Sequence, residues 1–379
     1  MPGIDNMLFA GENSSRHLCL HIVRSGIRRV QVVTDKLLVD LGVVEQATRA
    51  LTEQGVETMV FDGVLPDPTF QIVGDGLASY IHTGCDGILA IGGGSAIDSA
   101  KLIALAATNP QNPSSFIGYG KAKQKPAPLF AIATTSGTGS EATLGAVISD
   151  SLTHQKSVIS DRKLLPLAVA LDPLLLTGLP PHVTAATGMD ALTHAIEAII
   201  GVWDFGDSQN QARLATKLIF QNLPVACENG TDLAAREAMA YAAYCAGLAI
   251  NKTNIGNVHA IAHQLGRLYG VPHGLGNACA LPYVLDFSLG AAESRLAALA
   301  NLLELGEAGD SDRKLATRFI EAVRQLNQRI GVPEVLEQIK VEDIPSLADA
   351  AVKESLAYPV PILMSRADCS RILQQMAPR

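Results

Sequence analysis

The hydrophobic residues in the first half of the chain follow two alternating patterns. Short apolar runs, most of them rich in β-branched residues, occur at residues 30–33, 58–61, 87–91 and 129–133. Between these runs, residues 36–54, 69–83 and 95–107 repeat their apolar positions with the period of a helix. Strands that alternate with helices in this way predict a parallel sheet with helices on both faces.

The pattern changes after Pro180-Pro181, where alanine and leucine become frequent and strand signals are scarce. Helical periodicity then recurs at residues 184–200, 208–227, 231–250, 254–269, 291–305, 312–330 and 345–356. A chain of 379 residues exceeds the usual size of a single core. We therefore predict a Rossmann-like α/β domain over residues 1–178 and an all-helical domain over residues 179–379.

The composition narrows the range of partners. The 29 basic and 37 acidic side chains give a formal charge of −8, and no segment concentrates lysine or arginine, so nucleic acid and anionic membranes are poor partners. No apolar run could span a bilayer, and the start lacks the features of a secretory signal, so we expect a soluble, cytoplasmic protein. Six cysteines without any two-residue spacing are expected to be reduced thiols. Apolar helix faces suggest a homodimer or larger assembly, although a buried core explains them equally well.

Two pairs of residues in the predicted helical domain have the spacing of metal ligands. Asp190 and His194 are four residues apart, as are His259 and His263. In a helix this spacing puts both members of a pair on one face, where they can hold a common ion. Asp190 also lies in an otherwise apolar run, and burying its carboxylate without a partner would be costly.

A further histidine, His273, follows Gly270 and Pro272, where a helix cannot continue. An unbroken helix would carry His273 roughly 20 Å from His259, so the chain must turn back if the two share an ion. One carboxylate with neutral imidazoles suits iron, zinc, manganese or nickel better than calcium or magnesium. Each histidine alone could be an ordinary core or surface residue, but three of the nine lie between residues 259 and 273, which favours a metal site.

A triple glycine marks the first candidate cofactor loop. Gly92-Gly93-Gly94-Ser95 follows a predicted strand and precedes a predicted helix, where backbone amides and the helix dipole can bind a pyrophosphate. The segment is neither the common dinucleotide fingerprint nor a phosphate loop, and a tight turn is the alternative explanation. Asp98 could order this loop and Lys101 could reach a phosphate or pair with a neighbour, or each could be a surface charge.

A second candidate loop follows the predicted strand at residues 129–133 and is almost entirely hydroxylated residues and glycine, Thr134-Thr135-Ser136-Gly137-Thr138-Gly139-Ser140-Glu141. Its hydroxyl and amide donors can wrap a ligand without steric obstruction. Because both loops end parallel strands, we expect them to bind a dinucleotide at one edge of the sheet. Asp35 follows the first predicted strand, where its carboxylate could bind a ribose diol and repel a 2′-phosphate, which favours NAD over NADP. A helix cap is an equally good explanation of Asp35.

Several segments together resemble the iron-containing, group III alcohol dehydrogenases. They are the loops Gly92 to Asp98 and Thr134 to Glu141, and the stretches Gly188 to Ala198, Val258 to Gly266 and Val271 to Gly274. Their order agrees with the family too, and the resemblance covers nearly the whole chain. It implies an amino-terminal dinucleotide-binding domain and a carboxy-terminal helical domain, with NAD and Fe²⁺ in a cleft between them.

The resemblance also assigns roles to the candidate residues. It implies that Asp190, His194, His259 and His273 bind the metal, a choice among the histidines that spacing leaves open, and that His263 is a proton relay near the site. The residues expected at the cofactor are Asp35, Asp67, Gly92, Gly93, Gly94, Ser95, Asp98, Thr134, Thr135, Thr138, Lys156 and Thr177. Asp67 occupies a position where the family often has asparagine.

The implied reaction is the reversible oxidation of an alcohol, a primary alcohol or small diol, to an aldehyde or ketone, with Fe²⁺ as Lewis acid and hydride transfer to NAD. A zinc-dependent enzyme similar to glycerol dehydrogenase or dehydroquinate synthase is the alternative on the same scaffold. A metallohydrolase would need glutamate where the chain has Ala260-Ile261. A non-catalytic nucleotide-binding protein would not need four metal ligands.

Overall fold

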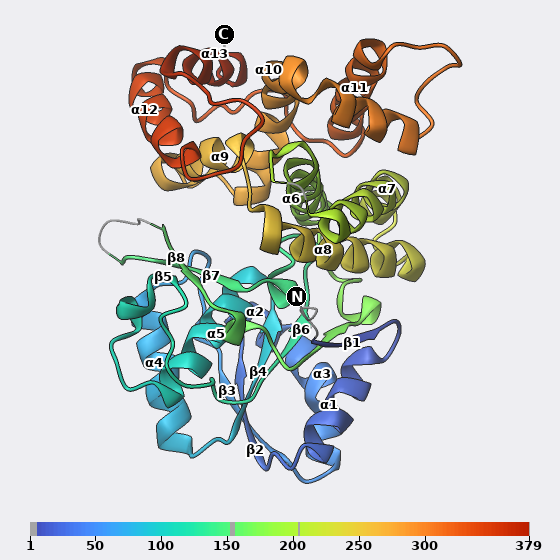
Figure 1. The fold of residues 1–379 in the computed structure, drawn as a ribbon. Helices are drawn as coiled ribbons and strands as arrows, with labels where there is room; N and C mark the ends of the chain where they lie inside the picture. Colours follow the sequence, from blue (N-terminus) through green and yellow to red (C-terminus); the bar gives the residue numbers. More distant parts are fainter. Residues whose placement is uncertain (1–5, 152–155, 204, 379) are drawn as a thin grey trace. The chain divides into compact units, whose positions relative to one another are not determined.

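The computed structural model describes residues 6–151, 156–203 and 205–378. The chain divides into two compact units, Met1–Gly178 and Leu179–Arg379. The first is an α/β unit, and the regular elements in the described part of the second are all helical (Figure 1). This is the fold class predicted from the sequence.

A six-stranded parallel sheet forms the centre of the first unit. Its strands are β1 (Met7–Ala10), β2 (Arg29–Val33), β3 (Glu57–Phe61), β4 (Gly87–Gly92), β6 (Leu129–Ala133) and β9 (Ala168–Leu171). They lie in the order β1-β9-β6-β4-β2-β3, and all neighbouring pairs are parallel. The four strands predicted from the sequence are β2, β3, β4 and β6. The pattern does not predict β1 and β9, which are four residues long each.

Helices cover both faces of this sheet (Figure 1). They are α1 (Ser14–Arg24), α2 (Lys36–Asp40), α3 (Val43–Glu53), α4 (Phe70–Thr83) and α5 (Gly94–Thr108). On one face, Leu18 and Ile22 of α1 and Leu51 of α3 pack into one core with buried side chains of the sheet. The single helix predicted over residues 36–54 is instead the pair α2 and α3, because Gly42 lies between them with φ 73°.

A smaller sheet lies in the same unit. Its strands are β5 (Gly118–Tyr119), β7 (Gly145–Ser149) and β8 (Lys156–Ser160), in the order β5-β8-β7. The sequence pattern does not predict this sheet. β7 contacts α5, the helix that follows the triple glycine, so the small sheet supports the predicted cofactor loop.

The second unit is a helical bundle. Its helices are α6 (Pro181–Ile200), α7 (Gly206–Glu228), α8 (Leu233–Thr253), α9 (Asn257–Tyr269), α10 (His273–Leu302), α11 (Asp312–Arg329), α12 (Ile344–Ser355) and α13 (Arg366–Met376). α6 packs against α7, α8 and α10, and most of its residues are buried. The predicted helix over residues 291–305 is only the second half of α10, and α13 is not predicted by the pattern.

The chain reverses between α9 and α10, as the predicted metal site requires. Gly270 ends α9 in the left-handed conformation, with φ 65°. Pro272 directly precedes His273, the first residue of α10. The two helices pack against each other, and the rings of His259 and His273 lie with their centroids 5.3 Å apart.

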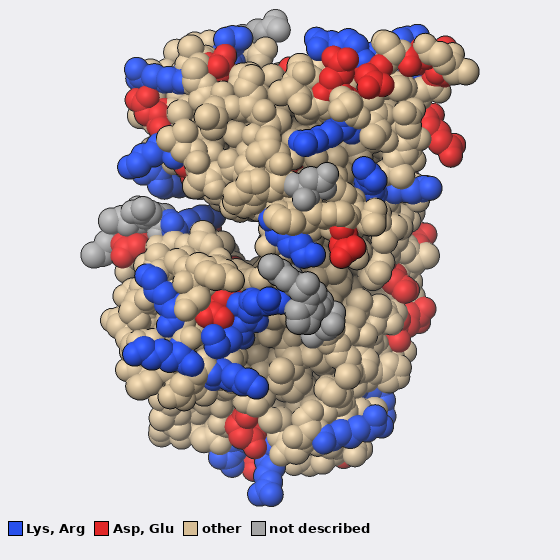
Figure 2. All heavy atoms as spheres, in the orientation of Figure 1, with Lys and Arg blue, Asp and Glu red and all other residues tan. Residues whose placement is uncertain are grey.

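The distribution of surface charge and the state of the cysteines agree with what the composition predicts. On the face drawn in Figure 2, acidic and basic side chains are interspersed with wide neutral areas. All six cysteines are free thiols, and five of them are buried. Among the helices that the structure describes, none is long and apolar enough to cross a membrane.

Candidate metal and cofactor sites

α6 presents Asp190 and His194 on one face, one turn apart. Both side chains are buried. The neighbouring Met189 and Leu192 belong to the hydrophobic core of the second unit. His194 Nε2 lies 3.9 Å from Asp190 Oδ1, so the i, i+4 spacing brings the two side chains together as predicted.

His259 and His273 approach the same carboxylate from two other helices. His259 lies in the first turn of α9, and His273 begins α10. Their Nε2 atoms are 3.6 and 3.3 Å from Asp190 Oδ1. One ligand atom from each of Asp190, His259 and His273 lies within 4.8 Å of the others. The His194 ring stacks on the His259 ring with centroids 4.6 Å apart, so four side chains from three helices converge.

Burial and charge act in opposite directions on this cluster. Burial would raise the pKa of Asp190, but the imidazoles of His194, His273 and His259 hold that pKa well below its usual range. Burial lowers the pKa of His194 to about 3, because it outweighs the opposing effect of Asp190. At neutral pH, Asp190 is therefore ionised and His194 is neutral, which are the protonation states that metal binding requires.

Two residues that the sequence analysis did not single out also touch the cluster. Glu197 Oε2 lies 2.6 Å from His259 Nδ1. Asn277 is fully buried and donates from Nδ2 to Asp190 Oδ1 at 2.7 Å. A signal for both was present in the sequence, because Glu197 lies seven residues after Asp190 and Asn277 lies four after His273, on the same helix faces.

Glu197 changes the charge of its partner. Burial lowers the pKa of His259, but the Glu197 and Asp190 carboxylates outweigh burial and raise the pKa to about 9. The ring therefore carries an extra proton at neutral pH when no metal is bound. A metal that binds at Nε2 must displace that proton.

His263 lies beside the cluster but is directed to a different carboxylate. Its ring stacks on His273 with centroids 5.2 Å apart, and its Nδ1 lies 2.5 Å from Glu354 Oε1. Glu354 also accepts hydrogen bonds from Gln264 Nε2 at 2.6 Å and from the Tyr358 hydroxyl at 2.7 Å. These contacts hold His263 next to the cluster and away from Asp190.

The donor set fits a divalent transition metal. Among the described residues, the ion-pair partners of the Asp190 carboxylate are all imidazoles, with no lysine or arginine. One carboxylate oxygen with imidazole nitrogens is a ligand set for iron or zinc, and is too rich in nitrogen for magnesium or calcium. The residues present therefore fit the metal that the sequence predicted.

In the first unit, the two predicted loops lie side by side at the carboxyl ends of β4 and β6. Thr134 N donates to Gly92 O at 3.0 Å. A Cβ on Gly93 would lie 3.0 Å from Thr135 Oγ1, and one on Gly94 would lie 2.8 Å from Thr138 Cγ2. Glycine is thus required for the loops to pack this closely. Ser95 follows in the first turn of α5, whose amino end opens at the same edge.

Asp98 and Lys101 stabilise the second loop from α5. The Asp98 carboxylate accepts hydrogen bonds from the Ser140 hydroxyl and, at 2.9 Å, from Val147 N. Lys101 is fully buried, and its Nζ donates to Gly145 O at 2.6 Å. Lys101 therefore does not lie on the surface, since its ammonium is enclosed by protein oxygens. It pairs with a neighbour, as one sequence interpretation expected, because its Nζ lies 3.7 Å from Asp98 Oδ1. Asp98 orders the second loop, whereas the sequence analysis expected it to order the triple-glycine loop.

Asp35 lies at the carboxyl end of β2, the neighbour of β4. The chain reverses its direction across the sheet between β2 and β4, and ligands of open α/β sheets bind at such a point. The Asp35 Oδ1 atom accepts a hydrogen bond from Leu38 N at 3.0 Å and caps α2. The cap occupies one carboxylate oxygen. Asp35 is therefore a helix cap, as its alternative explanation from the sequence expected.

The remaining predicted cofactor residues lie in less regular segments. Asp67 has a left-handed φ of 53°, and its Oδ1 pairs with Lys156 Nζ at 2.9 Å. Lys156 begins β8. Thr177 follows a short 3₁₀ helix (Pro173–Leu175) after β9, and its hydroxyl donates to Leu174 O at 3.1 Å.

Comparison with known proteins places the chain in a family. A model of the iron-containing alcohol dehydrogenases matches residues 6–173, and a model of the C-terminal part of the Fe-containing alcohol dehydrogenase family matches residues 184–377. The chain belongs to the iron-containing alcohol dehydrogenase family. As a member it is an oxidoreductase that transfers hydride between an alcohol and a nicotinamide cofactor.

Other iron-containing alcohol dehydrogenases are similar over almost the full length of the chain. The NAD-dependent methanol dehydrogenase of Bacillus methanolicus is 36% identical over 366 residues, 96% of each chain. The 1,3-propanediol dehydrogenase of Klebsiella pneumoniae is 38% identical over 376 residues, 98% of this chain and 97% of the relative. A crystal structure of 1,3-propanediol oxidoreductase matches with a TM-score of 0.95 and 38% identity, covering 98% of both chains.

The approach of α10 to α6 generates a prediction for the metal centre of this iron-containing alcohol dehydrogenase. A Cβ on Gly274 would lie 2.1 Å from the carbonyl oxygen of Ala186 in α6. Gly274→Ala must therefore displace the start of α10 and His273 with it. We expect at least a tenfold weaker Fe²⁺ affinity, measured by chelator competition under anaerobic conditions.

Gly290→Ala is the matched control for Gly274→Ala. Gly290 lies in the same helix, and a Cβ at this position would have no neighbouring atom within 4 Å. The variant should keep full iron affinity, since alanine is the better helix former. Undiminished iron affinity in Gly274→Ala would contradict the assigned role of this close approach.

Glu141 generates a prediction about pH. The side chain is buried, and burial raises the pKa of its carboxyl to about 7, against the opposing effects of its own backbone amide and of Lys101. In the unfolded chain it titrates near its ordinary value, so the folded state loses stability as pH rises from about 4.5 towards 7. Glu141→Gln should therefore gain stability relative to wild type as pH rises, by up to about 3 kcal/mol at pH 8.

Thermal melting of both proteins between about pH 5 and 8 measures this gain. The difference in stability should be smallest at the acid end, where the wild-type carboxyl is largely protonated. A difference that does not change with pH would show that Glu141 is ionised throughout this range.

Proposed function

We propose that this protein oxidises small alcohols to aldehydes or ketones with NAD, and catalyses the reverse reduction, at an Fe²⁺ centre held by Asp190, His194, His259 and His273. One observation carries the proposal: four donor side chains from three helices converge where the only negative charge among them is the buried Asp190. Family membership supports the same ligands.

When bound, Fe²⁺ supplies a Lewis acid for the substrate oxygen and NAD supplies the hydride acceptor. Asp190 contributes the negative charge of the ligand set, in surroundings that solvent screens little. Asn277 holds Asp190 through its amide, and Glu197 holds His259. These contacts orient the donor atoms before the substrate arrives, so less ordering is needed during the reaction.

We assign proton transfer to His263. Glu354 occupies Nδ1, so Nε2 is the nitrogen left to accept the proton that an alcohol loses on oxidation. Burial lowers the pKa of His263 to about 4, against the opposing effect of Glu354. The ring is then neutral at pH 7, and it would accept a proton only transiently and pass it on to solvent.

We place the cofactor at the carboxyl edge of the large sheet. The close packing of the two loops, and their position beside the point where the chain reverses across the sheet, support this assignment. The residues assigned to the cofactor site are Asp35, Asp67, Gly92, Gly93, Gly94, Ser95, Asp98, Thr134, Thr135, Thr138, Lys156 and Thr177. NAD is favoured over NADP because the Asp35 carboxylate would repel a 2′-phosphate.

The substrate class follows from the relatives. Their names specify methanol and 1,3-propanediol, which supports a primary alcohol or small diol as the substrate here. Zinc is the second candidate metal, because the same donor set suits both ions. Six free thiols support a reducing compartment such as the cytoplasm, and a homo-oligomer stays a prediction from the sequence.

An assay of primary alcohols and diols with NAD, after loading with Fe²⁺ or Zn²⁺, tests this function. We expect formation of reduced nicotinamide with Fe²⁺, loss of metal and activity in His259→Ala, and about 100-fold slower turnover with full metal content in His263→Ala. Full metal content in His259→Ala would refute the ligand assignment. Higher activity with Zn²⁺ than with Fe²⁺ would favour the zinc alternative.

Cofactor preference is tested by Asp35→Asn. Asparagine keeps the oxygen that caps α2 but removes the charge, so stability should not change. We expect the ratio of kcat/KM with NADP to kcat/KM with NAD to rise about tenfold, which corresponds to a change of roughly 1.4 kcal/mol in relative transition-state free energy. Asp62→Asn is the control, because Asp62 is an exposed carboxylate after the next strand, β3. An unchanged ratio in Asp35→Asn would remove Asp35 from the ribose site.

A further inference from the structure

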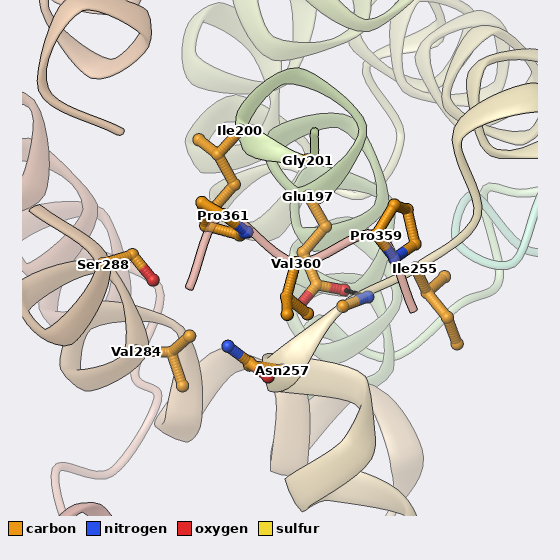
Figure 3. Close-up of a pocket in the computed structure, with 11 residues that line it drawn as sticks. Glu197, Ile200, Gly201, Ile255, Asn257, Val284, Ser288, Pro359, Val360 and Pro361 are labelled. Carbon is orange, nitrogen blue, oxygen red and sulfur yellow. Dashed lines mark hydrogen bonds between the residues drawn. The ribbon is translucent and has the colours of Figure 1, made fainter. Parts of the chain in front are cut away.

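Glu197 is a buried carboxylate that touches the metal centre without being one of the proposed ligands. It is 4% exposed and accepts hydrogen bonds from Gly256 N at 2.7 Å and Val258 N at 2.7 Å, in addition to its contact with His259 Nδ1 at 2.6 Å. Figure 3 shows Glu197 reaching from α6 toward the start of α9, where Asn257 is the first helical residue.

We propose that Glu197 is a positioning residue of the metal centre, which fixes the orientation of His259 and keeps a proton on Nδ1 so that Nε2 presents its lone pair to the ion. The inference rests on the proposed metal site and adds a residue to it. A carboxylate on the far nitrogen of a ligand histidine sets the tautomer and the direction of the ring.

His259 differs from the other proposed ligands in this respect. The Nδ1 atoms of His194 and His273 are buried and have no hydrogen-bond partner among the described residues. Among the residues that the structure describes, the Glu197 carboxylate forms an ion pair only with His259. The negative charge of Glu197 therefore acts directly on only one of the three proposed imidazole ligands, His259.

Glu197 also ties this ligand to the backbone. α9 has no side-chain cap of its own at Gly256, and the Glu197 carboxylate accepts hydrogen bonds from two amides at that helix start. The positive end of the helix dipole further favours a carboxylate there. One side chain of α6 thus fixes both the start of α9 and the ring that α9 contributes.

A carboxylate is needed at this position, because all three contacts require an acceptor. A glutamine would turn its NH₂ group either toward Val258 N or toward the pair formed by Gly256 N and His259 Nδ1. The first orientation places two donors against each other. The second favours a proton on Nε2, the atom needed for the metal.

Gly256 is the second part of this arrangement. A Cβ on Gly256 would lie 2.8 Å from Glu197 Oε1 and 3.0 Å from its carboxyl carbon. The carboxylate is at the end of a side chain, so it would move away from an alanine there. Gly256→Ala therefore displaces the same group without changing its chemistry.

The test measures the affinity of the metal-free protein for Co²⁺, followed by its absorption spectrum. Glu197→Gln and Gly256→Ala should each weaken Co²⁺ binding by about 10- to 100-fold while the far-ultraviolet circular dichroism is kept. Glu354→Gln is the matched control, because Glu354 makes the same contact with His263, which is not a proposed ligand. Gly266→Ala is the control in α9, since its Cβ would make only an ordinary contact of 3.5 Å. Both controls should bind Co²⁺ within about threefold of wild type.

A nitrogen NMR spectrum of the Zn²⁺-loaded wild type adds a measurement that needs no variant. We expect His259 to carry its proton on Nδ1, with the signal lost or moved in Glu197→Gln. A merely structural role for Glu197 would not move this signal.

The outcomes separate this inference from the proposed function. Wild-type affinity in folded Glu197→Gln, equal losses in Glu197→Gln and Glu354→Gln, or an unprotonated Nδ1 in the Zn²⁺-loaded protein would each overturn the positioning role. Should Glu197→Gln fail to fold, the same criteria apply to Gly256→Ala. Failure of the wild type itself to bind Co²⁺ would instead refute the metal centre, and the inference with it.

Discussion

A carboxylate buried in an apolar helix is the constraint on which the metal centre depends. Asp190 lies in the core of the second unit, where an uncompensated charge would be unstable. Its charge is balanced by imidazoles that arrive on α9 and α10, and by the amide of Asn277. The turn at Gly270 and the close packing at Gly274 are the backbone features that allow this, since both bring His273 back to α6.

The structure uses the same contact twice, with different consequences. Glu197 and Glu354 each lie against the Nδ1 atom of a histidine in α9. His259 is one turn before His263 and faces Asp190, whereas His263 faces Glu354 of α12. Identical local chemistry therefore yields a proposed ligand in one case and a proposed proton relay in the other. The difference lies in which helix each ring meets.

The candidate cofactor edge is built by other means. Small residues and backbone groups dominate there, and glycines let the two loops pack together. The charged residues nearby act on the protein itself: Lys101 and Asp98 hold the second loop through buried hydrogen bonds to its backbone and to Ser140. A ligand at this edge would meet amide and hydroxyl donors on a rigid support, which suits an anionic cofactor.

The sequence by itself determined the elements and the donor pairs within one helix. Period 2 and period 3.6 patterns are local, so β2, β3, β4, β6 and most helices could be predicted, as could the pairing of Asp190 with His194. Spacing left open which of His259, His263 and His273 approach Asp190, and only the family resemblance implied the choice. Only the tertiary structure decided where Lys101 is buried, and that Glu197 and Asn277 contact the site. Those contacts join residues far apart in the chain or on different helices. They depend on how helices pack, which no local periodicity encodes.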